Sequence, residues 1–161
     1  MAKFAGGVLI AVSLLGAPPA ALGQPVAGDR LITPWTSHRP AADRASTELV
    51  IVAIAIDTWH AAHASDPKRA LWLEAARQGC AQGSSQLVKR VITRTRPDGS
   101  DRQSFWSAHT ATTAATIGGV RVAISVPLTI GVGYLRIAAG KHWLTDTLAG
   151  GVVGYACSFV R

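Results

Sequence analysis

The fold is decided first by residues 48–63, which read ELVIVAIAIDTWHAAH. Apolar side chains occur on nearly every face of a helix drawn through this stretch. A helix that is apolar all round is usually buried in protein or in lipid. We therefore expect a buried helix from Glu48 to His63. Neither here nor elsewhere in the chain does a strand-like alternation of apolar and polar residues persist.

A second helix should follow almost directly. Ser65 and Asp66 are typical helix-start residues, and Pro67 occupies a first-turn position where its missing N–H costs no hydrogen bond. The helix that they open should continue to about Ile92. The next loop, residues 95–101, contains a Pro, a Gly and two Asp residues, a composition that ends helices.

The C-terminal third of the chain predicts the remaining helices. One helix should cover residues 109–125, and Pro127 should then break or kink the apolar stretch that continues over 128–137. A last helix should cover about 142–159, beginning at 142 or 143. The sequence therefore predicts an all-α fold, a compact helical bundle of about five helices, with no internal repeat.

Composition and the N-terminus indicate one exported domain. The 161 residues suffice for a single domain, and 48% apolar against 16% charged residues is more apolar than an average soluble domain. Residues 1–23 contain Lys3, the apolar run 4–15 and small residues before Gln24, which predicts a signal peptide or an N-terminal anchor. The rest of the chain would then lie in the cell envelope, with its site facing the periplasm. We expect residues 24–46 to form an irregular arm, and residues 47–161 the domain itself.

The charge and the cysteine content limit which classes of ligand and which kinds of site the chain can have. The net charge is +7, and the basic residues concentrate over 89–102 without the interleaved aromatic residues that single-stranded nucleic acids require. A pocket for phosphate explains this concentration better than nucleic acid does. Cys80 and Cys157 are the only cysteines and lack metal-site spacing. We interpret them first as two small buried residues, although an oxidising compartment would allow them to pair.

Several polar residues interrupt the apolar helices or lie at their ends. His142 and Asp146 are four residues apart, which places them on one face of a helix. The carboxylate could then accept the imidazole Nδ1–H and leave Nε2 as a nucleophile. Phosphoryl transfer also needs cations and oriented donors around the phosphate oxygens. The candidates for that task are Lys89, Arg96, Ser107, Ala108, His109 and Arg136.

The spacing of these residues resembles a known family. Lys89-x6-Arg96-Pro97, Ser107-Ala108-His109 and Arg136-x5-His142-x3-Asp146 are similar to the three-part signature of the type 2 phosphatidic acid phosphatases. That family also includes bacterial acid phosphatases and vanadium haloperoxidases. The resemblance covers residues 85–150. It implies a phosphatase that needs no metal or other cofactor and acts on a phosphate monoester or diphosphate, with a phosphorylated lipid at a membrane surface as the expected substrate.

The resemblance also assigns roles to the individual residues. His142 would attack phosphorus, Asp146 would orient it, and His109 would protonate the leaving oxygen. The phosphate would be held by Lys89, Arg96, Arg136, the Ser107 hydroxyl and the Ala108 backbone N–H. The chain departs from the family pattern at Trp106 for Pro, Ala108 for Gly and Leu135 for Ser. Ala108 is harmless if its φ is negative and strained if φ is positive.

Three other interpretations stay open. The chain could be a non-catalytic anion- or lipid-binding protein with a degenerate phosphatase pocket. It could be a haloperoxidase, since vanadate mimics phosphate in such a pocket. His60 and His63 could suggest a metal site, although the sequence places no third ligand beside them.

Overall fold

The computed structural model describes residues 23–31 and 39–161, and within them the protein is all-α, as predicted. The elements are α3 (Ala27–Leu31), α4 (Pro40–Ala62), α5 (Pro67–Val91), α6 (Ala108–Ala115), the short 3-10 helix η2 (Thr116–Gly118), α7 (Val122–Ala138) and α8 (Leu144–Cys157). The part of the chain described contains no β-strand, only an isolated bridge between Arg94 and Gln103.

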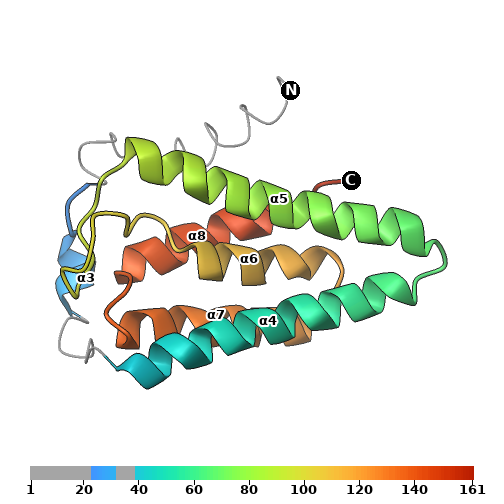
Figure 1. The fold of residues 1–161 in the computed structure, drawn as a ribbon, viewed down its shortest axis with the longest axis horizontal. Helices are drawn as coiled ribbons and strands as arrows, with labels where there is room; N and C mark the ends of the chain where they lie inside the picture. Colours follow the sequence, from blue (N-terminus) through green and yellow to red (C-terminus); the bar gives the residue numbers. More distant parts are fainter. Residues whose placement is uncertain (1–22, 32–38) are drawn as a thin grey trace.

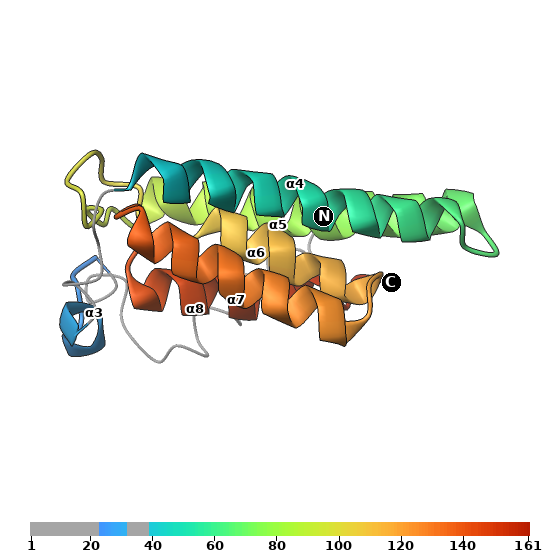
Figure 2. The same ribbon diagram turned by 90° about the horizontal axis from the view of Figure 1, so that it is seen from below.

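The helices form three layers. The long helices α4 and α5 lie antiparallel in one outer layer, α7 and α8 form the other, and α6 runs between the two layers (Figures 1 and 2). Helix α6 packs against all four of these neighbours. It consists of Ala, Thr and one His, and seven of its eight residues are buried. Small residues suit this central position because neighbouring helices can approach closely.

Helices α6 and α8 approach each other closely at Gly150 and Gly154. A Cβ atom at Gly150 would overlap the Ser107 carbonyl oxygen, and one at Gly154 would overlap the Ala111 carbonyl oxygen. Glycine is needed at both positions because any side chain would push the two backbones apart. The contact brings the first residues of α6 next to the first residues of α8.

Two predictions about the first half of the chain were wrong. Residues 24–46 are not simply an irregular arm, because they contain α3 and the first turns of α4, which begins at Pro40; residues 32–38 lie outside the described residues. Helix α4 is also not buried all round, since Ile51 and Val52 are 61% and 45% exposed. As an outer-layer helix, α4 contacts its neighbours on one side only (Figure 2).

The third predicted helix is divided at a different place. The break lies at Gly118–Gly119, between η2 and α7, whereas α7 continues through Pro127 without interruption. A Cβ atom at Gly119 would overlap Asp57 Oδ1, so the chain turns where α4 comes closest. Pro127 is tolerated because it and Ala123, whose carbonyl loses its helical partner, are both exposed to water.

Other boundaries agree with the sequence. Helix α5 begins at Pro67, and the Asp66 side chain caps it by accepting a hydrogen bond from the Arg69 N–H at 3.1 Å. Cys80 and Cys157 form a disulfide that joins α5 to the end of α8, so the pairing that the sequence left open is present and our first interpretation was wrong. The predicted signal or anchor covers residues 1–23, and all of these except Gly23 lie outside the described residues. Among the helices described, none has the length and apolar character needed to cross a bilayer.

Candidate active site

The predicted site residues gather at the end of the bundle where α5 ends and α6 and α8 begin. Ser107 is the N-cap of α6, and its backbone N–H donates to the Asp146 carbonyl oxygen at 3.0 Å. This hydrogen bond joins the second part of the motif directly to the third. The first part, Lys89 and Arg96, comes from the end of α5 and the loop that follows it.

The His142 ring is held in one orientation from behind. His142 is 1% exposed, and its Nδ1 lies 2.7 Å from the Ser104 carbonyl oxygen. Because a carbonyl oxygen can only accept, Nδ1 carries the proton and Nε2 keeps its lone pair. The nearest Asp146 oxygen, Oδ2, is 3.7 Å from Nδ1. The expectation that Asp146 accepts the Nδ1–H was therefore wrong.

The start of α8 explains why Asp146 does not reach the His142 ring. Helix α8 begins at Leu144, so His142 precedes it and the two residues do not share a helix face. The Asp146 carboxylate instead turns back to the start of α8, where Oδ2 accepts from the Trp143 N–H at 2.9 Å. Asp146 thus stabilises the turn that carries His142 and contributes negative charge at 3.7 Å.

Asp146 belongs to a buried ionic cluster that the sequence did not reveal. Arg94, 2% exposed, pairs with both Asp146 and Asp29, and the Ser104 hydroxyl donates to Asp146. Asp29 lies in α3 and also accepts from the Thr145 N–H at 2.9 Å. Burial opposes ionisation, yet contacts with His142, Arg94 and Ser104 hold the pKa of Asp146 below its ordinary value.

No local signal could have identified this cluster. Arg94 is one of several basic residues between 89 and 102, and nothing in the pattern separates it from Arg90 or Arg102. Asp29 is 65 residues away in sequence, in a stretch that reads as an irregular arm. Ser104 acts partly through its backbone carbonyl, which every residue has.

Three cations face the two histidines. Burial first, and then the neighbouring charges of Arg96 and Arg136, lower the pKa of Lys89. Arg136 pairs with Asp43 of α4, and Arg96 Nε lies 2.7 Å from Asp101 Oδ1. Lys89 makes no ion pair with any other described residue. The site therefore carries a surplus of positive charge, which suits a multiply charged anion.

Burial, together with this positive charge, keeps both rings neutral. Burial, reinforced by Arg136 and His142, lowers the pKa of His109 to about 4. Burial also lowers the pKa of His142 to about 4, against the opposing effect of Asp146. His109 is half-buried, and its Nε2 lies 3.4 Å from Thr47 Oγ1 on α4. Near pH 7 the free site thus contains two neutral imidazoles beside three cations.

The segment 106–108, which contains two of the departures from the family pattern, is held in place by its contacts. Ala108 is the first residue of the right-handed helix α6, so its backbone is in the harmless conformation. The Ser107 Oγ is committed to capping, since it accepts from the Thr110 N–H at 3.3 Å and from the Thr110 hydroxyl at 2.9 Å. Trp106 is fully buried, and its Nε1 donates to Ser85 Oγ at 2.8 Å. It is a core residue.

His60 and His63 lie away from this site, near the end of α4. The His63 ring lies against Trp59, with ring centroids 4.0 Å apart, and its Nδ1 is 2.8 Å from the Trp59 carbonyl oxygen. Within residues 23–31 and 39–161, no group of three or more His, Cys, Asp or Glu side chains is arranged to hold a metal ion.

Comparisons with family models, with curated proteins and with solved structures found no match to this chain.

Proposed function

We propose that this protein is a metal-independent phosphatase that hydrolyses a phosphate monoester or diphosphate through a phosphohistidine on His142. The observation that carries the proposal is the His142 ring, fixed at Nδ1 by the Ser104 carbonyl and placed beside three cations, of which Lys89 makes no ion pair with a described residue. A neutral imidazole with a free Nε2 is a nucleophile, and the cations suit the negative charge on the phosphoryl oxygens during transfer.

The reaction would proceed in two balanced steps. His142 Nε2 forms a bond to phosphorus while the bond to the leaving oxygen breaks, and His109 gives its proton to that oxygen. Water then attacks the phosphohistidine, His109 takes a proton from it, and inorganic phosphate leaves with His142 neutral again. Lys89, Arg96 and Arg136 would hold the phosphate oxygens, together with the Ala108 N–H at the start of α6.

The pKa of His109 predicts how the rate depends on pH. The acid must be protonated and His142 must be neutral, and in the free site the pKa of each is about 4. Since kcat/KM reports the free enzyme, it should peak near that value and fall on both sides. A bound phosphate dianion raises the pKa of His109, so kcat should persist to higher pH than kcat/KM. Coincident profiles would argue that His109 does not act as the acid.

Substrate class and location follow as parts of the same proposal. The substrate is a phosphorylated lipid or a small phosphate ester, and the protein works in the cell envelope, facing the periplasm. The Cys80–Cys157 disulfide supports this location because disulfides persist in oxidising compartments.

The test is phosphate release from p-nitrophenyl phosphate. We expect His142→Ala to abolish turnover and His60→Ala, a change of an exposed histidine on α4, to leave it unchanged.

His109→Ala should slow alkyl esters about 10²–10⁴-fold and aryl esters far less, because aryl leaving groups need little protonation. Turnover should survive EDTA, and vanadate should inhibit by resembling five-coordinate phosphorus. Full activity in His142→Ala would refute the proposal.

A second candidate is a non-catalytic binding protein with the same pocket. The capping role of Ser107 favours it, because that hydroxyl is already engaged with Thr110. Inorganic phosphate would then bind with no turnover of any ester. Calorimetric titration of phosphate into the wild type, beside the assay above, separates the two functions.

A further inference from the structure

Helices α7 and α8 expose no charged side chain. Each contains a single one, Arg136 in α7 and Asp146 in α8, and these are only 5% and 0% exposed. The other outer layer differs, since α4 and α5 expose charged residues such as Arg44, Glu48 and Arg90. Two adjacent outer helices without an exposed charge are unusual for a protein surface in water.

Large apolar side chains occupy this surface instead. They follow one another at helical spacing along each helix, so each set forms a stripe. The stripes are Val122, Val126, Ile130 and Tyr134 on α7, and Leu148, Val152, Tyr155 and Phe159 on and just after α8, all at least 37% exposed. We call these two stripes the α7–α8 face.

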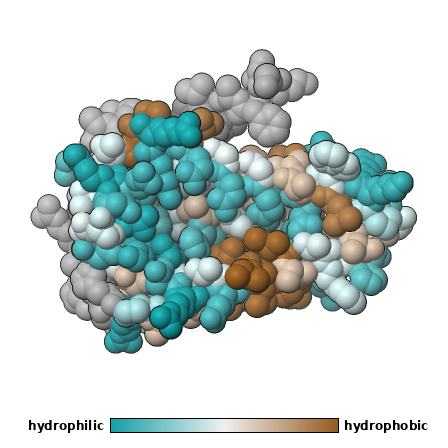
Figure 3. Space-filling model, in the orientation of Figure 1, coloured by the Kyte–Doolittle hydropathy of each residue, from teal (hydrophilic) through white to brown (hydrophobic). Residues whose placement is uncertain are grey.

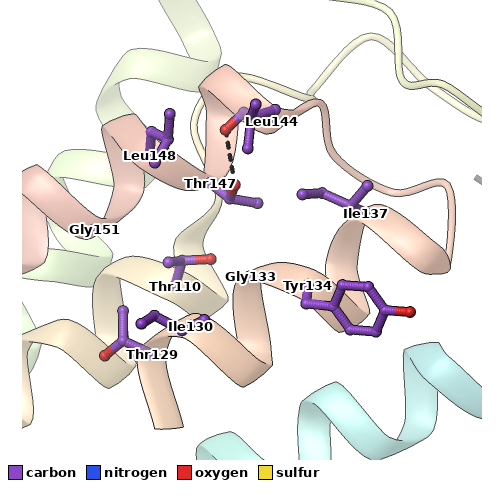
Figure 4. Close-up of a pocket in the computed structure, with 10 residues that line it drawn as sticks. All are labelled: Thr110, Thr129, Ile130, Gly133, Tyr134, Ile137, Leu144, Thr147, Leu148 and Gly151. Carbon is purple, nitrogen blue, oxygen red and sulfur yellow. Dashed lines mark hydrogen bonds between the residues drawn. The ribbon is translucent and has the colours of Figure 1, made fainter. Parts of the chain in front are cut away.

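A groove of about 400 Å³ runs between the stripes (Figure 4). Ile130, Tyr134 and Leu148 stand along it, and Gly133 and Gly151 leave it open because they carry no side chain. The groove adjoins both stripes, at Ile130 and Tyr134 on α7 and at Leu148 on α8. The opposite side of the molecule, over α4 and α5, is largely hydrophilic, with a hydrophobic patch along α4 (Figure 3).

We propose that the α7–α8 face docks on a lipid surface that contains anionic headgroups. The charges around the face are basic: exposed Arg121 precedes α7, and exposed Arg161 follows α8. The two helices are antiparallel, so both arginines lie at the same end of the face (Figure 1). Lys141, in the turn at the other end, pairs with Asp98 at 2.8 Å. Tyr134 and Tyr155 supply the rings with a polar tip that suit a membrane–water interface.

The same charges disfavour a second copy of the chain as the occupant. A two-fold dimer would place the same face on both partners. Neither helix, nor the turn between them, offers an unpaired carboxylate to meet Arg121 or Arg161. A bilayer avoids this conflict, because its headgroup phosphates meet the arginines and its acyl region receives the stripes.

Docking of this kind needs no spanning helix. Helices α7 and α8 would lie flat, with their stripes at the boundary between headgroups and acyl chains. The proposal does not depend on the phosphatase proposal, because it involves neither His142 nor the cations around it.

The two native cysteines make a direct test possible. Both are in the disulfide, so one introduced cysteine is the only free thiol available for a polarity-sensitive fluorophore. Ile130→Cys and Leu148→Cys place the label on the α7–α8 face, and Trp72→Cys, at a residue 77% exposed on α5, is the matched control. The full chain is mixed with phosphatidylcholine vesicles, with and without phosphatidylglycerol.

On vesicles that contain phosphatidylglycerol, labels at 130 and 148 should shift to shorter wavelength and be quenched by brominated acyl chains. The label at 72 should behave as in water. Vesicle-bound protein whose labels at 130 and 148 stay in water, or protein that does not bind, would overturn the proposal. A shift without vesicles that grows with protein concentration would overturn it in favour of self-association.

Discussion

Two buried aspartates at opposite ends of the bundle show different chemistry. Asp146, at the proposed site, is 0% exposed and is bound by Arg94, the Ser104 hydroxyl and the Trp143 N–H. Asp57, beside the Gly118–Gly119 break, is 1% exposed, and neither of its carboxylate oxygens accepts a hydrogen bond from a described residue. Burial and then Glu74 raise the pKa of Asp57 to about 7, although Arg77 opposes this.

The difference shows that partners, rather than depth, decide whether a buried carboxylate is charged. Asp146 stays ionised because oriented donors replace the water that it has lost. Asp57 has no such donors and becomes protonated near neutral pH. The chain therefore maintains a buried negative charge where we propose that a histidine attacks phosphorus, and it does not do so at the other end of the bundle.

The largest effect should come from removing Arg94, the cation of the buried ionic cluster around Asp146. Arg94→Met leaves Asp146 and Asp29 buried without their common partner, so we expect a loss of about 3–5 kcal/mol in unfolding free energy. Chemical denaturation measures this loss. Arg90→Met, at an exposed position on α5, is the control and should stay within about 0.5 kcal/mol. Equal stability of the two variants would contradict the importance of the cluster.

A smaller effect concerns the contact that aligns α6 with α8. Gly154→Ala places a methyl group against the Ala111 carbonyl oxygen, which is backbone and cannot move aside. We expect a loss of about 3 kcal/mol, at the upper end of overpacking costs. Gly151→Ala is the matched control, because its Cβ would meet nothing closer than Thr110 Cγ2 at 3.9 Å. Similar melting temperatures for the two variants would show that α6 and α8 are not so closely packed.

The protonation of Asp57, at the opposite end of the bundle, can be tested through the pH dependence of the unfolding free energy. The pKa of Asp57 is about 7 in the folded protein, against an ordinary 3.8. Between these two values the folded protein therefore keeps a proton that the unfolded chain has released. The contribution of Asp57 to stability should therefore decline as pH rises from about 4 to 7 and stay constant above. We expect Asp57→Asn to gain on the order of 4 kcal/mol relative to wild type between pH 4 and pH 8. A difference that does not change with pH would mean that Asp57 is ionised throughout.

The smallest effect should come from Ala108. As the first residue of α6 it already has the backbone conformation that leaves its N–H at the helix start. Ala108→Gly should therefore change kcat by less than about tenfold, or 1.4 kcal/mol. A gain of about a hundredfold would indicate that the alanine damages the pocket, and would favour the binding-protein function.

Local signals predicted the fold where local interactions set it. The start of α5 follows from the Asp66 cap and Pro67, and both act within one helical turn. The end of α6 was misplaced because the Gly118–Gly119 break is set by Asp57, about 60 residues earlier, and not by the more conspicuous Pro127. Helix α3 was missed for a similar reason, since Asp29 interacts with distant Arg94 and Thr145.

The candidate site shows the same limit. Residue types and spacing were enough to select eight residues that the fold gathers at one end of the bundle. The spacing did not reveal what each side chain does there. The Ser104 backbone carbonyl orients His142, in the place that sequence spacing suggested for Asp146. Backbone groups carry no sequence signal, so this exchange was visible only in the folded chain.

The phosphatase proposal requires that His142 becomes phosphorylated during turnover. Rapid acid-free quenching of the wild type with a fast aryl phosphate, followed by peptide mass spectrometry, detects and locates a phosphoryl group. We expect an acid-labile, base-stable adduct on His142, which is absent in His142→Ala and retained in His60→Ala. Ester hydrolysis that proceeds without any adduct on His142, or with the adduct on another residue, would contradict the account.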